Sequence, residues 1–376
     1  MRVEGIEVLV APLALREPVA SAGLTQLDKT TLFLRVVTDA GIGWGECAAY
    51  PAARPPDLAV DDLEPVVVDR VLGRLRAAGP VGTLPPADAI AETCGGEGSV
   101  GEQMVAATIE MAVLDAELKA LGRSLASWLG VGRRQVESGS LVGIPPGRDL
   151  GRLLDAAGAA IGRGARRLRL KIEPGWDRTP LAAVRDQFGD VPLLADANGS
   201  YGPGQQPALR ALDDLALVCL EQPFAPGDLA AHRSLAETMV TPIGLDESLW
   251  SAGRVEEAVG AGACRVACLK PGRLGGVAAT ISAAVACASA GIACFVGGFF
   301  ESGLARALNA ALAGRDEFSL PGDLGDPDGY LVANPFSYLE TAGGLVLLSE
   351  DPGIGAEPRP GLLEQVARHR WVSWSS

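Results

Sequence analysis

The chain has 376 residues and a net charge of −14, enough length for a barrel of about 250 residues with a second lobe. The acidic balance argues against nucleic acid as a partner, because phosphate binding needs clustered Lys and Arg. Seven cysteines without close pairing, in a chain that lacks a basic and apolar leader, predict a cytoplasmic protein.

The first 135 residues predict an α+β lobe. Its expected strands are Ile6–Pro12 and Thr31–Val37, and its expected helices are Leu63–Ala78 and Gln103–Leu121. The glycines of residues 41–45 could form a nucleotide loop, but no phosphate-binding helix follows them, so they favour a hairpin. The stretch 80–101, rich in Pro and Gly, is expected to connect the two helices.

From Ser138 onward, short apolar runs alternate with amphipathic stretches such as Asp149–Gly162 and Leu274–Ala290. Eight of these runs predict strands, at residues 140–144, 167–172, 192–198, 217–223, 243–247, 265–271, 293–298 and 318–322. This alternation predicts a parallel α/β barrel. After about Asp326 the chain resumes short β-like runs, and we expect this tail to pack back on the first lobe.

The uncharged stretch Val277–Phe300 is long enough to cross a membrane. It is rich in Ala, Ser and Gly, and Ser289-Ala-Gly291 divides it into a helix and a strand of the barrel repeat. The sequence therefore predicts no membrane segment.

Five polar residues close successive apolar runs at nearly constant intervals. Lys171, Asp196, Glu221, Asp246 and Lys270 are separated by 25, 25, 25 and 24 residues. Because successive parallel strands end at the same rim of a barrel, we expect these side chains to converge there.

The three acidic members of this series predict a metal site. A single acidic residue at a strand end commonly caps a helix, but Asp196, Glu221 and Asp246 end consecutive strands and supply hard oxygen ligands suited to Mg²⁺. Cys264 and Cys268 are a poor zinc pair, since residues i and i+4 of a strand lie about 13 Å apart.

The two lysines predict acid/base chemistry beside the metal. Lysine is a poor base unless cationic neighbours or desolvation favour its neutral form, and Arg169 lies two residues before Lys171 on the same strand face. Lys270 is expected across the barrel mouth, on the opposite side of a bound substrate. Asn198 shares the face of Asp196 and can support the site.

The strings LRLKIEPGWD, DAN, EQP, LDES, LKPGRLGG and GGFFESG, together with GWGEC and EMAVLDAEL, resemble the enolase superfamily over nearly the whole chain. Within it the chain resembles the muconate-lactonizing group, specifically the o-succinylbenzoate synthase/N-succinylamino acid racemase family. This resemblance implies a (β/α)7β TIM-like barrel with an α+β capping domain formed by the N-terminal region and the C-terminal tail. The implied boundaries are residues 1–135 for the cap, 136–325 for the barrel and 326–376 for the returning tail.

The resemblance also implies site residues and a function. Its metal ligands correspond to Asp196, Glu221 and Asp246, holding Mg²⁺ with Mn²⁺ as a substitute, and its acid/base residues to Lys171 and Lys270. The supporting positions are Arg169, Asn198, Glu247, Arg273 and Glu301. The implied protein is a homo-oligomer that acts on a small carboxylate, as an o-succinylbenzoate synthase-type dehydratase of menaquinone formation that works through a metal-stabilised enediolate.

Two alternatives stay open in the sequence. An N-succinylamino acid racemase or related epimerase would use the same two lysines on opposite faces of the substrate, and an inactive barrel would serve as a binding protein. The chain departs from the family pattern at Arg169, where Lys is common, and in residues 18–25, which lack the Arg and the aromatic residues common in the family's mobile loop.

Overall fold

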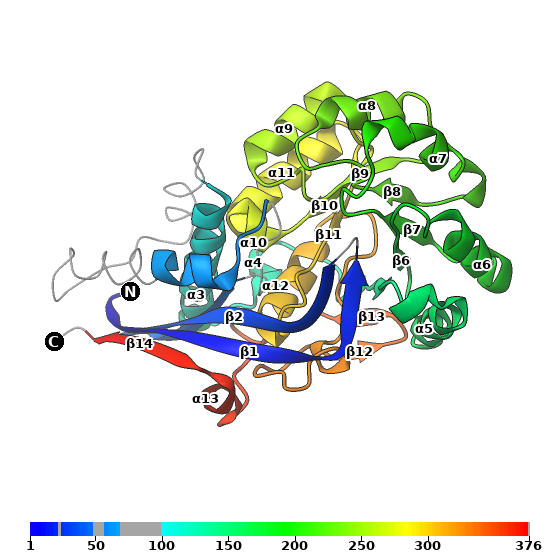
Figure 1. The fold of residues 1–376 in the computed structure, drawn as a ribbon. Coiled ribbons are helices and arrows are strands. Elements are labelled where there is room, and N and C mark those ends of the chain that lie inside the picture. Colours follow the sequence, from blue (N-terminus) through cyan, green and yellow to red (C-terminus); the bar gives the residue numbers. More distant parts are fainter. Residues whose placement is uncertain (22–23, 48–55, 68–98, 375–376) are drawn as a thin grey trace.

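The structure is a computed structural model that describes residues 1–21, 24–47, 56–67 and 99–374. It combines an antiparallel sheet, a parallel barrel sheet surrounded by helices, and a C-terminal segment that returns to the first sheet (Figure 1). In the described part of the chain, no helix is both long and apolar enough to cross a bilayer.

The cap sheet has the strand order β14-β1-β2-β3. Its strands are β1 (Val3–Ser21), β2 (Leu24–Thr38), β3 (Gly41–Cys47) and β14 (His369–Trp374). The two N-terminal strands predicted from sequence lie inside β1 and β2, which are longer because they pair from Val3 with Thr38 to Ser21 with Leu24. The predicted glycine hairpin is confirmed, since Thr38 pairs with Gly41 across a two-residue turn.

Helix α3 (Val100–Ala120) packs against this sheet and is buried on nearly all sides, which places it between the cap sheet and the barrel. Two glycines of β3 permit the close approach: a Cβ at Gly43 would lie 1.9 Å from the carbonyl oxygen of Ala112, and one at Gly45 would lie 2.1 Å from that of Thr108. Of the other predicted cap helix, Leu63–Ala78, residues 63–67 are helical and the rest lies outside the described residues, as does most of the expected 80–101 connection.

The barrel sheet contains seven parallel strands in the order β11-β10-β9-β8-β7-β6-β5. They are β5 (Ser140–Val142), β6 (Leu168–Lys171), β7 (Leu193–Asp196), β8 (Cys219–Glu221), β9 (Ile243–Leu245), β10 (Val266–Leu269) and β11 (Ala293–Val296). The helices between and after them are α5 (Leu150–Gly162), α6 (Arg178–Phe188), α7 (Gln206–Arg210), α8 (Leu229–Ala236), α9 (Ala252–Ala261), α10 (Pro271–Leu274), α11 (Val277–Ser289) and α12 (Gly303–Ala313). Helices α5 to α9 and α11 lie along the outside of the strands (Figure 1). The uncharged stretch is thus the helix α11 and the strand β11, as predicted.

The prediction of a regular eighth strand at residues 318–322 is wrong. This segment forms single parallel bridges, from Phe318 to Cys294 of β11 and from Gly322 to Ser138 just before β5. Pro321 has no N–H for a continuous ladder, so only isolated hydrogen bonds form. The segment nevertheless joins the first and last strands and brings the sheet around into a barrel.

Small elements link the barrel to the cap. They are α4 (Leu125–Trp128), β4 (Gln135–Glu137), β12 (Thr341–Ala342), β13 (Leu345–Leu347) and α13 (Leu362–Val366). Strand β13 pairs with both β12 and β4, and β14 pairs with β1, so the C-terminal segment contacts the chain at the start of the barrel and in the cap.

Candidate active site

The five strand-end residues singled out by their spacing meet at one rim of the barrel. Lys171, Asp196 and Glu221 are the last residues of β6, β7 and β8, and they lie side by side because Lys171 pairs with Asp196 and Asp196 pairs with Glu221 in the parallel register. Asp246 and Lys270 directly follow β9 and β10. All five are buried.

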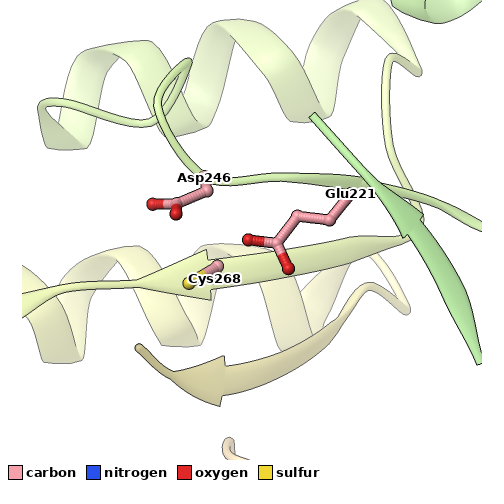
Figure 2. A group of neighbouring side chains, drawn as sticks. All are labelled: Glu221, Asp246 and Cys268. Carbon is pink, nitrogen blue, oxygen red and sulfur yellow. The ribbon is translucent and has the colours of Figure 1, made fainter. Parts of the chain in front are cut away.

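The carboxylates of Glu221 and Asp246 lie close enough to share one cation. Ligand atoms of Glu221, Asp246 and Cys268 lie within 4.8 Å of one another (Figure 2). Asp196 is joined to the group through Arg169, whose Nη2 is 2.7 Å from Asp196 Oδ2. Among the described residues, the buried Oε2 of Glu221 has no hydrogen-bond partner, so this atom is available to a ligand.

Asp196, Glu221 and Asp246 form a carboxylate cluster, and nearby cations compensate their negative charges unevenly. Burial opposes ionisation, yet Arg169 and Lys171 hold the pKa of Asp196 below its ordinary value, and Lys270 and Arg273 similarly hold the pKa of Asp246 well below. Burial raises the pKa of Glu221 well above its ordinary value, and the neighbouring carboxylates add to this effect. A buried carboxyl with an unpartnered oxygen and acidic neighbours fits a divalent cation, because that ion would relieve the repulsion.

Cys268 was not predicted to belong to this group. It lies on β10 two residues before Lys270, and the alternation of side chains along a strand is the signal that could have identified it. Burial and then Asp246 raise the pKa of its thiol well above the ordinary value, and its soft sulfur suits Mg²⁺ less than the hard carboxylate oxygens do.

The two lysines contact different carboxylates of the cluster. Nζ of Lys171 donates to Asp196 Oδ2 at 2.6 Å and to Asn198 Oδ1 at 2.8 Å. Nζ of Lys270 donates to Asp246 Oδ2 at 2.8 Å and lies 4.7 Å from the centre of the Phe299 ring. Lys171 ends β6 and Lys270 directly follows β10, and three other strands separate β6 from β10 in the sheet, so the amines approach the cluster from two sides.

The predicted supporting residues have three different placements. Asn198 donates to Glu247 Oε1 at 2.9 Å, which links the first lysine to the acidic residue after Asp246. Arg273 donates to Asp246 Oδ1 at 2.6 Å and so orients that carboxylate. Glu301 instead accepts from Asn309 and pairs with Arg306 of α12 at 2.7 Å, so its carboxylate faces a barrel helix.

Three residues that hold the site, Asp57, Asp323 and Gln222, were missed by the sequence analysis; Asp57 and Gln222 are buried and Asp323 is partly buried. Asp57 of the cap accepts two hydrogen bonds from Arg273, each of 2.7 Å, and Asp323 accepts one from Arg169 at 2.7 Å. Gln222 accepts from the backbone N–H of Asp246 at 3.1 Å. Only Gln222, next to Glu221 in EQP, carried any signal in the sequence, because the other two lie far along the chain from their partners.

A pocket opens between the barrel rim and the cap. Its barrel side is lined by Lys171, Asn198 and Lys270, and its cap side by Ser21, Leu24 and Gln26 at the ends of β1 and β2. Residues 18–25 differ in sequence from the family's mobile loop, and three of them, Val19, Ser21 and Leu24, line the pocket. Residues 22–23 lie outside the described residues. A small molecule bound here would contact both lysines and the cap.

Comparisons with known families and proteins agree with this architecture. Residues 152–362 match the enolase C-terminal domain-like family, and residues 5–130 match the N-terminal domain of mandelate racemase and muconate lactonizing enzyme. The chain is 37% identical to an N-succinylamino acid racemase from an Amycolatopsis species over 374 residues, which cover 99% of this chain and 100% of that protein.

Further matches include an o-succinylbenzoate synthase from Geobacillus stearothermophilus, 32% identical over 346 residues, which cover 91% of this chain and 90% of that protein. The crystal structure of an enolase superfamily member from Listeria innocua superposes with a TM-score of 0.91 at 28% identity, covering 100% of this chain and 99% of that one. The chain belongs to the enolase superfamily and, within it, to the o-succinylbenzoate synthase/N-succinylamino acid racemase family.

Proposed function

We propose that this protein is a Mg²⁺-dependent dehydratase of the o-succinylbenzoate synthase type, with Lys171 and Lys270 as its acid/base residues. The observation that carries the proposal is the pair of buried amines, each hydrogen-bonded to a different carboxylate of one cluster, beside a pocket that both lysines and the cap line. Family relatives with the name o-succinylbenzoate synthase support the same reaction.

Asp196, Glu221 and Asp246 would hold the ion, with Mn²⁺ as a substitute, because all three offer hard carboxylate oxygens. Bound there, a divalent cation supplies electrostatic stabilisation for the negative charge that develops on the substrate carboxylate when the adjacent carbon loses its proton. Asn198 and Arg273 orient the surrounding side chains through their contacts with Lys171 and Asp246.

Lys171 would remove the proton α to the carboxylate of the cyclohexadiene precursor. The electron pair of the broken C–H bond then forms a ring double bond as the β-hydroxyl departs, and the protonated Lys171 gives its proton to that hydroxyl, which leaves as water. Lys270 stays cationic across the pocket, where its Nζ is held by Asp246, and stabilises the charge on the other side.

A racemase of N-succinylamino acids is a second candidate, supported by the approach of the two lysines from separate strands. In that reaction one lysine removes the α-proton and the other returns a proton to the opposite face. The relatives from Amycolatopsis and Thermus thermophilus, 37% and 36% identical, carry the name N-succinylamino acid racemase.

The substitution Lys171→Ala tests the proposal. Removal of a general acid/base is expected to lower the rate of o-succinylbenzoate formation by about 10³-fold or more. The matched control is Lys119→Ala, which removes a lysine of the cap that pairs with Asp115 and should leave the rate unchanged. Dehydration by Lys171→Ala at nearly the wild-type rate would contradict the assigned role.

Three further measurements separate the rival functions. Deuterium from D₂O that appears at the α-carbon of both enantiomers of an N-succinylamino acid indicates racemisation, whereas a stoichiometric aromatic product indicates dehydration. Calorimetry that detects no binding of Mg²⁺ would favour the inactive barrel. The homo-oligomeric state and the cytoplasmic location stay predictions from the sequence.

A further inference from the structure

Among the described residues, Arg169 is the cation that makes the most contacts with the carboxylate cluster of Asp196, Glu221 and Asp246. Its Nη2 lies 2.7 Å from Asp196 Oδ2 and 3.2 Å from Asp246 Oδ2, and it donates a very short hydrogen bond to Glu221 Oε1. A single nitrogen atom therefore contacts all three carboxylates proposed as metal ligands. The side chain is 2% exposed, so these interactions are not weakened by bulk water.

The opposite edge of the same guanidinium is anchored. Nη1 of Arg169 donates to Asp323 Oδ2 at 2.7 Å. Asp323 is itself fixed, because its backbone N–H donates to the carbonyl of Val296 at 2.9 Å and its other carboxylate oxygen accepts from Arg167 Nη2 at 2.7 Å. The guanidinium of Arg167 packs on the Phe295 ring, 4.5 Å from its centre, which completes a rigid support.

This double attachment depends on the shape of arginine. A guanidinium presents nitrogen donors on two edges in one plane, so it bonds to Asp323 on one side and to the carboxylate cluster on the other. A lysine has one nitrogen at the end of a flexible chain. Lys171 illustrates the difference, since its Nζ ends a flexible chain and pairs with Asp196 at 2.6 Å.

We propose that Arg169, anchored by Asp323, is a fixed counter-cation that competes with the divalent metal ion and sets its affinity. The ion needs oxygen atoms that the guanidinium already contacts, and the two cations repel each other at close range. Arg169 therefore stabilises the carboxylate cluster before metal binding and weakens the binding itself. The inference rests on the metal site of the proposed function.

The test measures Mg²⁺ binding by calorimetry without substrate, and the thermal midpoint of unfolding in EDTA, for wild type, R169K and R169M. Both variants are expected to unfold at lower temperature in EDTA, because three buried carboxylates lose part or all of their counter-cation. Both should bind Mg²⁺ about tenfold tighter or more, with R169M the tighter of the two, because the repelling charge is held more loosely in R169K and is absent in R169M. The stabilisation by Mg²⁺ should rise accordingly.

The matched control is R167K. Arg167 is equally buried and contacts Asp323, but it makes no ion pair with the carboxylate cluster among the described residues. R167K keeps a cation beside Asp323 and leaves the contact of Arg169 Nη1 with Asp323 in place, so it should lower the unfolding midpoint and change the dissociation constant for Mg²⁺ by less than twofold. Such a result shows that general loss of packing does not tighten metal binding.

Two outcomes would overturn the proposal, in different ways. Dissociation constants for R169K and R169M within twofold of wild type, or weaker, would overturn the competition and leave the proposed function intact. If R169M does not fold, the dissociation constant of R169K decides. Absence of Mg²⁺ binding in wild type and in every variant would overturn both the metal site and the inference that depends on it.

Discussion

Glu221 illustrates, at the scale of one residue, how function and stability oppose each other. Its carboxyl is fully buried among Asp196 and Asp246, and burial together with these neighbours raises its pKa well above the ordinary value. Ionised Glu221 therefore costs folding free energy unless a cation compensates it. The residue is retained, on our proposal, because the metal ion needs it.

The substitution Glu221→Gln should separate these two effects. In EDTA the variant is expected to unfold at a higher temperature than wild type, since burial of the ionised carboxyl costs more than its contact with Arg169 returns. Its affinity for Mg²⁺ should fall by about 100-fold, because a neutral amide is a weaker ligand. Thermal unfolding with and without Mg²⁺ measures both effects, and a variant destabilised in EDTA would contradict the interpretation.

Gly276 is a second residue whose identity is dictated by its contacts. Its φ is +117°, and a Cβ there would lie 1.8 Å from Oε2 of Glu110. Gly276→Ala is therefore expected to lower the free energy of unfolding by at least about 2 kcal/mol, through backbone strain and collision together.

Gly291→Ala is the matched control for this substitution. Gly291 also has a positive φ, +72°, but no atom lies within 4 Å of the position of a Cβ. The free energy of unfolding of Gly291→Ala should fall by only about 1 kcal/mol, which is the cost of placing alanine in the left-handed conformation. Denaturant unfolding measures both changes, and equal losses would show that the contact with Glu110 is unimportant.

At the scale of elements, acidic residues of the cap bind the N-termini of barrel helices. Glu110 of α3 accepts hydrogen bonds from the backbone N–H groups of Val277 and Ala278 at the start of α11. Glu46 of β3 accepts from the N–H groups of Ser302 and Ala305 at the start of α12. Helix N-termini attract negative charge, so these contacts fix the two helices against the cap.

Glu110 should make stability depend on pH. Burial raises its pKa from 4.5 to about 7, against the opposing effect of the two backbone donors. Between pH 4.5 and about 7 the folded protein binds more protons than the unfolded chain. The contribution of Glu110 to the free energy of unfolding is therefore complete below pH 4.5 and is lost as the pH rises to about 7. The loss amounts to about 3 kcal/mol.

Glu110→Gln should remove this part of the pH dependence, since the amide does not titrate. Denaturant unfolding of both proteins across the window from pH 4.5 to 7 measures the difference in slope. Asp149→Asn, which alters the exposed N-cap residue of helix α5, should keep the wild-type dependence of unfolding free energy on pH. Identical slopes for wild type and Glu110→Gln would refute the assignment.

At the scale of the whole molecule, the cap and the barrel share buried charge. Asp57 and Arg273 are each 1% exposed, and their two hydrogen bonds of 2.7 Å join a cap residue to the guanidinium that orients Asp246. The geometry of the site therefore depends on cap docking, and the pocket lies where the two parts meet.

Asp57→Asn should destabilise the entire protein, by about 3 kcal/mol, because it leaves a buried guanidinium with half of its partner. We expect one unfolding transition at a lower temperature rather than two, which calorimetry can resolve. Asp214→Asn disrupts a similar pair with Arg178 on the surface and should not change the midpoint. Two separate transitions in Asp57→Asn would show that the cap unfolds independently.

The sequence by itself determined the order of the barrel and the convergence of its strand ends. A repeated β-α unit imposes a local periodicity, and each side chain from Lys171 to Lys270 needs only its own strand end to reach the common rim. The hairpin at Asp39 and Ala40 was equally predictable, because its turn lies within a few residues of both strands.

Only the tertiary structure decided which distant residues support that rim. Asp57 and Asp323 reach Arg273 and Arg169 through contacts between segments more than 150 residues apart, as their separations of 216 and 154 residues show. Barrel closure by residues 318–322 likewise depends on single bridges to two distant strands. Such contacts arise from the packing of whole elements, so no local pattern of residues encodes them.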